Sequence, residues 1–313
     1  MATVEPLPSQ AAPGAALHGA DLLAWRSCLL ALGGRPDAFD WLLDLGGGLR
    51  WRDLQALRLD PERTVLLERP LAELEALWQR HRRDAEPLQY LVGLCPWRDL
   101  ELQVAPGVLI PRQETELLVD LAVALMPSDG FGEASALHWA DLGTGSGCLA
   151  VALARAFPGR RGWAVDASDE ALRQARLNLA AAAVLPAVTL RQGDWWQPLR
   201  PCWGKLVLVV SNPPYIPSAT VQQLEPVVRR HEPLAALDGG VDGLDSIRRI
   251  AAEASQALAP GGLLLLEHHH DQSAAVGQLL RAAGLTDLQV HRDLEGVPRF
   301  ASARRPPLAE ESR

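Results

Sequence analysis

The sequence predicts an α/β protein in which a doubly wound sheet follows a small helical bundle and a linking β-hairpin. Three observations lead to this prediction. Apolar residues recur at helical spacing from Leu22 to Leu32. From residue 112 onward, helical patterns alternate with short strands, as they do in a doubly wound sheet. One of these strands, 206–210, is a continuous apolar run, which is typical of a parallel strand buried on both faces.

The N-terminal part of the chain is predicted to be a helical bundle over residues 18–88. Helical patterns cover 22–32, 39–43, 51–57 and 71–83, and glycine runs end the first two. Such a bundle is more plausible as a partner-docking module than as a catalytic one. Two further domains follow, a β-hairpin linker at 89–110 and an α/β domain at 111–305, and disordered tails are expected at 1–17 and 306–313.

A glycine loop follows the first strand of the α/β domain, predicted at 136–142. The loop reads Gly143-Thr144-Gly145-Ser146-Gly147, and a helix is predicted over 148–157. Backbone at such a loop and helix N-terminus can approach a ligand closely. The loop lacks the third glycine of Gly-x-Gly-x-x-Gly, which weakens a dinucleotide interpretation, and no Gly-Lys-Ser/Thr follows, which excludes a Walker loop.

Acidic residues stand at the ends of the next two strands. Asp166 ends the strand at 163–166, where a carboxylate can accept both ribose hydroxyls of a nucleoside. Asp194 follows the strand at 188–190 and could bind an adenine amino group, while Trp195 could cover the ring. One such acid is more often a strand-end cap. Acids in this order along successive strands predict a nucleoside site.

The strand at 206–210 leads into Ser211-Asn212-Pro213-Pro214-Tyr215. Asn-Pro after a strand is a common turn, so the motif alone is ambiguous. Two prolines fix φ and remove two N–H donors, which leaves carbonyls free to accept hydrogen bonds. One amide, rigid carbonyls and an aromatic ring suit a planar –NH2 group. The motif therefore predicts methyl transfer to an amide or exocyclic amine nitrogen.

The C-terminal strands near 288–291 and 299–303 are predicted to form an antiparallel edge pair. Before them stands the run His268-His269-His270-Asp271. Adjacent residues on a strand point to opposite faces, so three consecutive histidines cannot bind one ion from regular structure. We expect no metal site there.

These motifs, in this order, resemble the class I S-adenosylmethionine methyltransferases. Further segments narrow the resemblance to the N5-glutamine methyltransferases of the HemK/PrmC family, namely 86–93, 110–116, 231–237, 242–245 and 263–268. That family methylates the glutamine of the Gly-Gly-Gln motif in class-1 peptide release factors. The resemblance extends from about residue 18 to about 305. The chain differs at His269 and His270, where glycine commonly follows Glu-His, and at Trp97, where the family usually has Phe.

The resemblance implies a Rossmann-like fold and assigns the site residues. The methyl donor, S-adenosyl-L-methionine, would contact the glycine loop, Asp166, Asp194, Trp195 and Asn212, and would leave as S-adenosyl-L-homocysteine. The target glutamine would contact Asn212, Pro213, Pro214 and Tyr215. The Asn212 oxygen and the Pro213 carbonyl would accept its two N–H groups, and Tyr215 would stack on the amide plane. No general base is needed, because the extra proton can leave after transfer.

Whole-chain properties limit the partners of this 313-residue chain. The formal net charge of −8 argues against a broad nucleic-acid surface, so no DNA partner is expected. The four cysteines lie more than 50 residues apart, without metal or redox spacing, and read as reduced thiols of a cytoplasmic protein. No apolar stretch approaches the ~20 residues that span a bilayer. We expect no membrane partner and a monomer.

Alternative functions remain open at this point. A ribosomal-protein glutamine N5-methyltransferase would have similar motifs, and the sequence does not separate it from a release-factor enzyme. An adenine-N6 nucleic-acid methyltransferase uses a similar motif but predicts a basic groove. In a non-enzymatic nucleotide-binding regulator, residues of the glycine loop or of the 212–215 motif would be expected to be replaced. Both motifs are intact in this chain.

Overall fold

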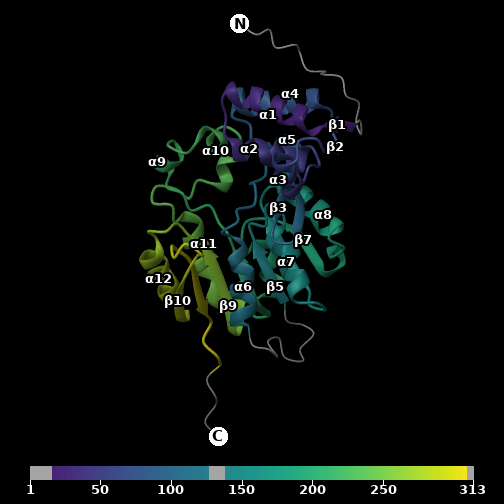
Figure 1. The fold of residues 1–313 in the computed structure, drawn as a ribbon. Coiled ribbons are helices and arrows are strands. Elements are labelled where there is room, and N and C mark those ends of the chain that lie inside the picture. Colours follow the sequence, from purple (N-terminus) through teal and green to yellow (C-terminus); the bar gives the residue numbers. More distant parts are fainter. Residues whose placement is uncertain (1–15, 127–137, 309–313) are drawn as a thin grey trace. The chain divides into compact units, whose positions relative to one another are not determined.

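A computed structural model of the chain describes residues 16–126 and 138–308 (Figure 1). By their internal contacts, the described residues of Met1–Leu94 and Pro226–His231 form one compact unit, and those of Cys95–Glu225 and Glu232–Arg313 form another. Most of the two predicted tails, and residues 136 and 137 of the first predicted strand, lie outside the described residues. No helix in the described ranges is long and apolar enough to cross a membrane.

The first unit is mainly helical, and its core is built on aromatic packing. Phe39 makes edge-to-face contacts with Trp25 and Trp78, at ring-centroid distances of 5.5 and 4.7 Å. Helices cover all four segments in which the sequence predicted them. The described helices are α1 (Gly19–Ala31), α2 (Pro36–Trp41), the π-helix η1 (Leu42–Gly46), α3 (Trp51–Leu59), α4 (Leu71–Asp84), α5 (Leu88–Val92) and α10 (Pro226–Arg229).

Two features of this unit were not predicted from the sequence pattern. Strands β1 (Ala16–His18) and β2 (Thr64–Leu66) pair as a short antiparallel ribbon. Residues 226–231 also belong here, although the neighbouring residues on both sides belong to the second unit. Within the first unit, His231 Nε2 lies 2.9 Å from the Asp84 carbonyl oxygen.

The second unit is an α/β domain. In its described residues, seven strands form one sheet in the order β10-β11-β9-β8-β5-β6-β7. Strand β11 pairs antiparallel with both neighbours, and the other pairings are parallel. This confirms the predicted doubly wound class and its antiparallel edge pair. The strands are β5 (His138–Leu142), β6 (Gly162–Asp166), β7 (Val188–Gln192), β8 (Leu206–Ser211), β9 (Leu258–Glu267), β10 (Thr286–Arg292) and β11 (Pro298–Arg304).

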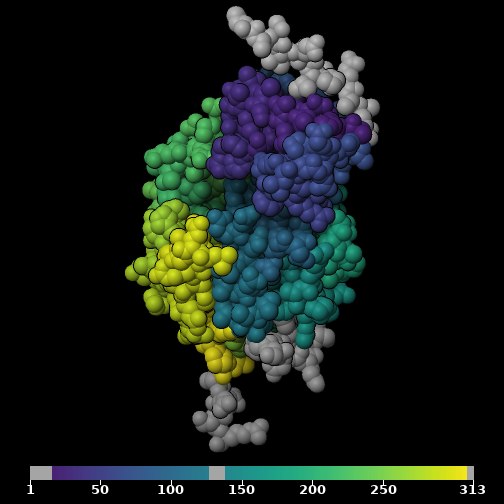
Figure 2. All heavy atoms as spheres, in the orientation of Figure 1, coloured from purple at the N-terminus to yellow at the C-terminus, as the bar shows by residue number. Residues whose placement is uncertain are grey.

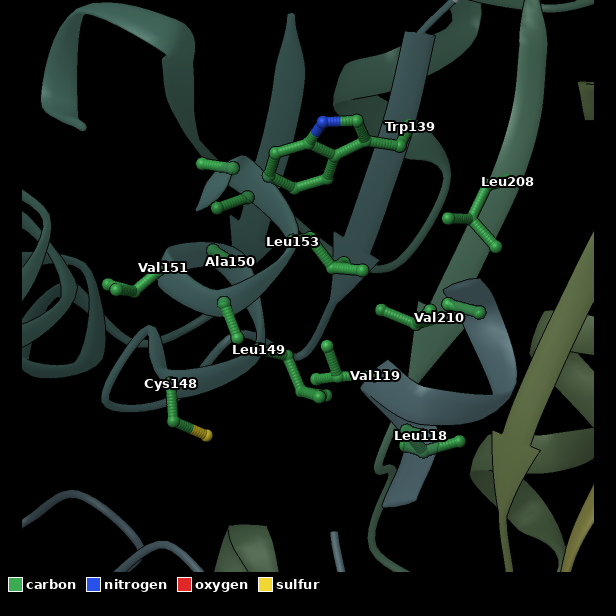
Figure 3. Packing of buried hydrophobic residues seen from close by; sticks show 14 of the residues in the cluster. Leu118, Val119, Trp139, Cys148, Leu149, Ala150, Val151, Leu153, Leu208 and Val210 are labelled. Carbon is green, nitrogen blue, oxygen red and sulfur yellow. The ribbon is translucent and has the colours of Figure 1, made fainter. Parts of the chain in front are cut away.

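Helices cover both faces of this sheet. Helices α6 (Glu116–Leu125), α7 (Cys148–Ala156) and α8 (Asp169–Ala181) pack in one apolar cluster, while α11 (Asp245–Ala257) and α12 (Ser273–Ala282) pack in another. Figure 3 shows side chains of α6, α7, β5 and β8 meeting in the first cluster. Because both faces of the central strands are buried, β8 is apolar up to Ser211 and β9 is apolar from Leu263 to Leu266, and polar groups stand at the ends of these strands.

Smaller elements also belong to the second unit, among them short 3₁₀ helices at Leu185–Ala187, Gln197–Cys202 and Leu234–Ala236. Strands β3 (Leu94–Trp97) and β4 (Leu100–Gln103) form the hairpin, which is shorter than the predicted 89–110, and α9 (Ser218–Val221) is a single turn. At the C-terminal edge, Arg304 donates to the Leu125 carbonyl at the end of α6. Figure 2 shows the yellow C-terminal surface next to the blue surface around α6.

Close packing at the start of β6 gives a first test of the fold. A Cβ at Gly162 would lie 2.0 Å from the fully buried Trp139 ring, so Gly162→Ala forces backbone or ring to move. We expect it to lower the free energy of unfolding in urea by about 1–3 kcal/mol. Gly277→Ala in α12 is the matched control, because only the ends of flexible side chains approach that position. It should leave stability unchanged or raise it by up to about 1 kcal/mol. Equal losses in both variants would contradict the packing.

Candidate active site

The site lies where the order of the parallel strands reverses. From β5 the sheet continues to β6 and β7 on one side and to β8 and β9 on the other. Leu142 and Ser211, the last residues of β5 and β8, are register partners, and the Ser211 hydroxyl donates to the Leu142 carbonyl at 2.6 Å. Ligands of open α/β sheets bind in the crevice at this position. The pairing brings the glycine loop and Asn212 next to each other, although the ends of their strands are 69 positions apart in the sequence.

A cavity of about 550 Å³ opens at this crevice, a size typical of small-molecule sites. Glycine-loop, strand-end and Asn-Pro-Pro residues share its wall. Of the predicted site residues, Gly143, Gly145, Asp166, Asp194, Trp195, Asn212 and Pro214 line it; other lining residues include Gly107, Val108, Leu109, Val165, Ser168, Pro233 and Ala236. Thr144, Ser146, Gly147, Pro213 and Tyr215 are not in its lining.

The glycine loop exposes backbone to the cavity at Gly143 and Gly145, which have φ of +74° and +54°. Gly147 has another task. A Cβ there would lie 2.9 Å from the Ala175 Cβ on α8, so Gly147 permits close packing of the loop on this helix. Gly147 therefore allows the close packing that the third glycine of a Gly-x-Gly-x-x-Gly loop would provide, although it stands one position earlier. Thr144 and Ser146 are buried and shape the loop from within, so their contact with a donor stays a prediction.

Asp166 is held rigidly at the end of β6. Its Oδ2 accepts from the Gly145 N–H and its Oδ1 from the Ser168 N–H, both at 2.9 Å. Burial raises the pKa of the carboxyl, and these hydrogen bonds oppose the rise. Each carboxylate oxygen has a second lone pair, so Asp166 can still accept two hydroxyls from a ligand in the cavity.

Trp195 and Asp194, which follow β7, also line the cavity. Trp195 has an unusual φ of +47°, and its ring lies 3.3 Å from where a Cβ on Gly143 would be. The indole therefore faces the start of the glycine loop, and this loop position requires glycine. The Asp194 carboxylate is paired through Oδ2 with Arg249 on α11. An adenine amino group would therefore have to donate to the other oxygen of Asp194, Oδ1.

Asn212 is joined to Tyr215 by a buried hydrogen-bond network. The Asn212 Nδ2 donates to Thr115 Oγ1 at 2.8 Å, and Thr115 donates to Glu267 Oε2 at 2.7 Å. The Tyr215 hydroxyl donates to Glu267 Oε1 at 2.9 Å. Among the described residues, no donor reaches the Asn212 Oδ1. The amide oxygen thus remains available to accept a hydrogen bond from a ligand.

Glu267 is a fully buried acid, and the sequence analysis assigned it no role. Burial raises its pKa to about 7, although hydrogen bonds from Thr115 and Tyr215 lower it. Burial and the neighbouring carboxylate also raise the pKa of Tyr215 well above its usual value, so the phenol remains a donor. Thr115 lies 152 residues from Glu267, and no local motif could have linked them.

Asp141 is a second buried acid without a predicted role. Its Oδ2 accepts from the Thr144 hydroxyl at 2.7 Å, and its Oδ1 has no hydrogen-bond partner among the described residues. Burial raises its pKa to about 7. The strand-end position, just before the glycine loop, was the only signal in the sequence.

The histidine run, 268–270, directly follows Glu267 in the sequence. His268 is fully buried, and His269 Nδ1 contacts the Asp271 carboxylate at 2.6 Å. Within residues 16–126 and 138–308, no three His, Cys, Asp or Glu side chains gather as metal ligands would.

Comparison with known sequences gives strong matches. The model of the methyltransferase small domain matches residues 119–227. The release factor glutamine methyltransferase of Prochlorococcus marinus is 49% identical over 286 residues, which are 91% of this chain and 97% of that protein. The release factor glutamine methyltransferase of Synechocystis is 40% identical over 301 residues, 92% of this chain and 97% of that protein.

Solved structures give weaker matches. A release-factor-specific protein-(glutamine-N5) methyltransferase of Alicyclobacillus acidocaldarius is 31% identical, with a TM-score of 0.38 over 66% of this chain and 100% of that one. The catalytic domain of human METTL16 gives a TM-score of 0.49 at 14% identity, over 78% of this chain and 84% of that one.

The raised pKa of Glu267 makes a prediction about stability. The unfolded acid ionises near 4.5 and the folded one near 7, so the stability that the protonated group contributes is present below pH 4.5 and lost as pH rises through about 7. The loss is about 3 kcal/mol at most. Glu267→Gln should therefore gain stability relative to wild type as pH rises across this window, measured as urea unfolding at several pH values. Glu101→Gln, which removes an exposed carboxylate, is the control. A wild-type-minus-variant difference that stays constant with pH would contradict the assignment.

Proposed function

This chain belongs to the release factor glutamine methyltransferases, and we propose that it transfers a methyl group from S-adenosyl-L-methionine to the side-chain nitrogen of a glutamine. The target would be the Gly-Gly-Gln glutamine of a class-1 peptide release factor. One observation carries the proposal. A single cavity is lined both by the glycine loop with Asp166 and by Asn212, whose Oδ1 has no donor among the described residues.

The residues of the cavity fit the proposed donor. Asp166 would accept the ribose hydroxyls with its remaining lone pairs. Gly143 and Gly145 would let backbone approach the donor closely, and Trp195 would cover the adenine ring, with Asp194 near its amino group. S-adenosyl-L-methionine would supply an electrophilic methyl group on a sulfonium and would leave as S-adenosyl-L-homocysteine.

The Asn-Pro-Pro-Tyr residues would present the acceptor. A glutamine nitrogen is a weak nucleophile because its lone pair is delocalised into the carbonyl. Asn212 Oδ1 and the Pro213 carbonyl would accept its two N–H groups and aim the nitrogen at the methyl group. Pro214 would form part of the wall beside the amide, and Tyr215 would hold the amide plane. Alignment of this kind can contribute up to ~7–11 kcal/mol, and the same oxygens stabilise positive charge that develops on nitrogen.

The substrate assignment follows from family membership. A ribosomal-protein glutamine would fit the same acceptor residues, and an adenine amino group also presents a planar –NH2. The net charge of −8 disfavours the nucleic-acid alternative. A protein substrate of translation would place the reaction in the cytoplasm.

The first unit would dock the protein substrate, which extends the prediction made for residues 18–88. It has its own apolar core, and it also exposes the large apolar side chains of Leu32, Trp51 and Leu59. Such a surface would add contact area that a short Gly-Gly-Gln loop cannot supply. We propose that the chain acts as a monomer.

Removing the Asp166 carboxylate tests the donor site. Asp166→Ala should weaken binding of S-adenosyl-L-methionine at least tenfold in calorimetry, because each hydrogen bond to a charged group contributes ~1.5–3 kcal/mol. Asp169→Ala, at the exposed start of α8, is the matched control and should bind like wild type. Wild-type affinity in Asp166→Ala would remove this residue from the site.

Changing Asn212 tests the acceptor site. Asn212→Ala should abolish transfer to the release factor while only partly weakening donor binding, because the lost oxygen orients the glutamine nitrogen. Asn212→Asp keeps one acceptor but adds charge beside the amide, and it should also be impaired. The assay measures transfer of a tritiated methyl group. Gln223→Ala is the control, because Gln223 lies after α9 and is exposed. Near-wild-type turnover in Asn212→Ala would rule out the orientation mechanism.

The same assay identifies the substrate class. Release factor, ribosomal protein, DNA and RNA are offered side by side, and mass spectrometry locates the methyl group. We expect one methyl group on the Gly-Gly-Gln glutamine. Labelling of a nucleic acid, with release factor unmodified, would refute the proposed function.

A further inference from the structure

The hydrogen bonds behind Asn212 have a fixed direction. When its carboxyl is ionised, as it is above its pKa of about 7, Glu267 has no proton and can only accept hydrogen bonds. Tyr215 and Thr115 each have one hydroxyl proton, and both donate it to Glu267, at 2.9 and 2.7 Å. Thr115 Oγ1 then has only lone pairs left for its remaining neighbour, the Asn212 amide at 2.8 Å. The amide must therefore turn its Nδ2 towards Thr115.

This direction decides which end of the Asn212 amide faces the cavity. With Nδ2 bound to Thr115, the Oδ1 is left to meet the acceptor. If the amide were reversed, its –NH2 would face another –NH2, and neither could accept a hydrogen bond. The geometry of a side-chain amide is nearly symmetric, so shape alone does not prevent the reversal. Only a neighbour that cannot donate prevents it.

We propose that Glu267 and Thr115 are positioning residues that fix the orientation of the Asn212 amide and thereby make the site an acceptor of N–H groups. The inference rests on the proposed function for its consequence in turnover, but the orientation itself is a property of this chain. Glu267 and Thr115 are 1% and 2% exposed and do not line the cavity, so they act through Asn212 and Tyr215.

A purely structural role explains Glu267 poorly. A fully buried carboxylate is costly to desolvate, and well-packed apolar residues of similar volume often stabilise a fold as well or better. The position lies at the end of β9, where the preceding residues, 263–266, are all leucine. An acid at the end of this apolar strand has its clearest use in the two hydroxyl groups that it orients.

A matched pair of variants at Thr115 separates the hydroxyl from the packing. Thr115→Val keeps the shape and removes the hydroxyl, so kcat for release factor should fall about tenfold or more, with donor affinity unchanged by calorimetry. Thr115→Ser keeps the hydroxyl and loses a methyl group, so it should recover most of that turnover. Equal losses in the two variants, or full turnover in Thr115→Val, would overturn the inference.

A spectroscopic readout is independent of the substrate. The sequence contains two asparagines, Asn178 and Asn212. Selective ¹⁵N labelling of asparagine therefore gives two side-chain –NH2 groups, assigned by the loss of one signal in Asn212→Ala. The Nδ2 of Asn178 donates to the Gln103 and Ser146 carbonyls at 2.9 and 2.8 Å, which makes this residue an internal control.

In wild type, one Asn212 amide proton should show the low-field shift and slow water exchange of a buried hydrogen bond. Thr115→Val and Glu267→Gln should each shift this signal, while Thr115→Ser and the Asn178 signals should stay close to wild type. An Asn212 signal that does not respond to either variant would overturn the inference. Wild type that leaves glutamine unmethylated would instead contradict the proposed function, and the spectra would still decide the orientation.

Discussion

The parallel pairing of β5 with β8 is the constraint on which the rest of the site depends. It places the ends of two strands, 69 residues apart in the sequence, in register at Leu142 and Ser211. Both strands are covered by helices on both faces, so their interiors hold apolar side chains and offer no room for chemistry. The polar groups of the site therefore stand at the strand ends, as Asp166 and Glu267 do, or in the loops that follow, as Asn212 does. One loop supplies exposed backbone, and the other supplies an amide and rigid carbonyls.

Buried acids hold the groups of these loops in place through hydrogen bonds. Asp166 is fixed by two backbone N–H groups, while Asp141 and Glu267 are fully buried and have pKa values raised to about 7. Each acid accepts hydrogen bonds from groups that shape the crevice. The desolvation that these acids suffer is a cost to folding. In return, the hydroxyls of Thr115 and Tyr215 have one arrangement rather than several.

The sequence predicted those parts of the site that are local. The glycine loop, Asp166 and the Asn-Pro-Pro-Tyr motif each stand directly after an apolar strand, and the structure brings Gly143, Gly145, Asp166 and Asn212 to one cavity. The alternation of helices and strands was likewise enough to predict the doubly wound class. A short apolar run is buried wherever it lies in such a sheet, so its pattern is visible without tertiary information.

What the sequence did not predict depends on distant contacts. The Thr115–Glu267 hydrogen bond joins residues 152 positions apart, and residues 226–231 belong to a unit otherwise formed before residue 95. The β1–β2 ribbon joins two three-residue strands, too short for a pattern to form. Gly147 was considered only as a ligand-binding glycine, because its neighbour Ala175 lies on the next helix.

The most direct test of the account is a neutron crystal structure of the chain with S-adenosyl-L-homocysteine and a Gly-Gly-Gln peptide, because the hydrogens that it shows distinguish an amide nitrogen from its oxygen. We expect the glutamine nitrogen to lie within hydrogen-bond distance of both Asn212 Oδ1 and the Pro213 carbonyl oxygen, facing the donor sulfur, with Asn212 Nδ2 still bound to Thr115. A glutamine amide that binds elsewhere, or one that meets the Asn212 nitrogen instead of its oxygen, would contradict the account.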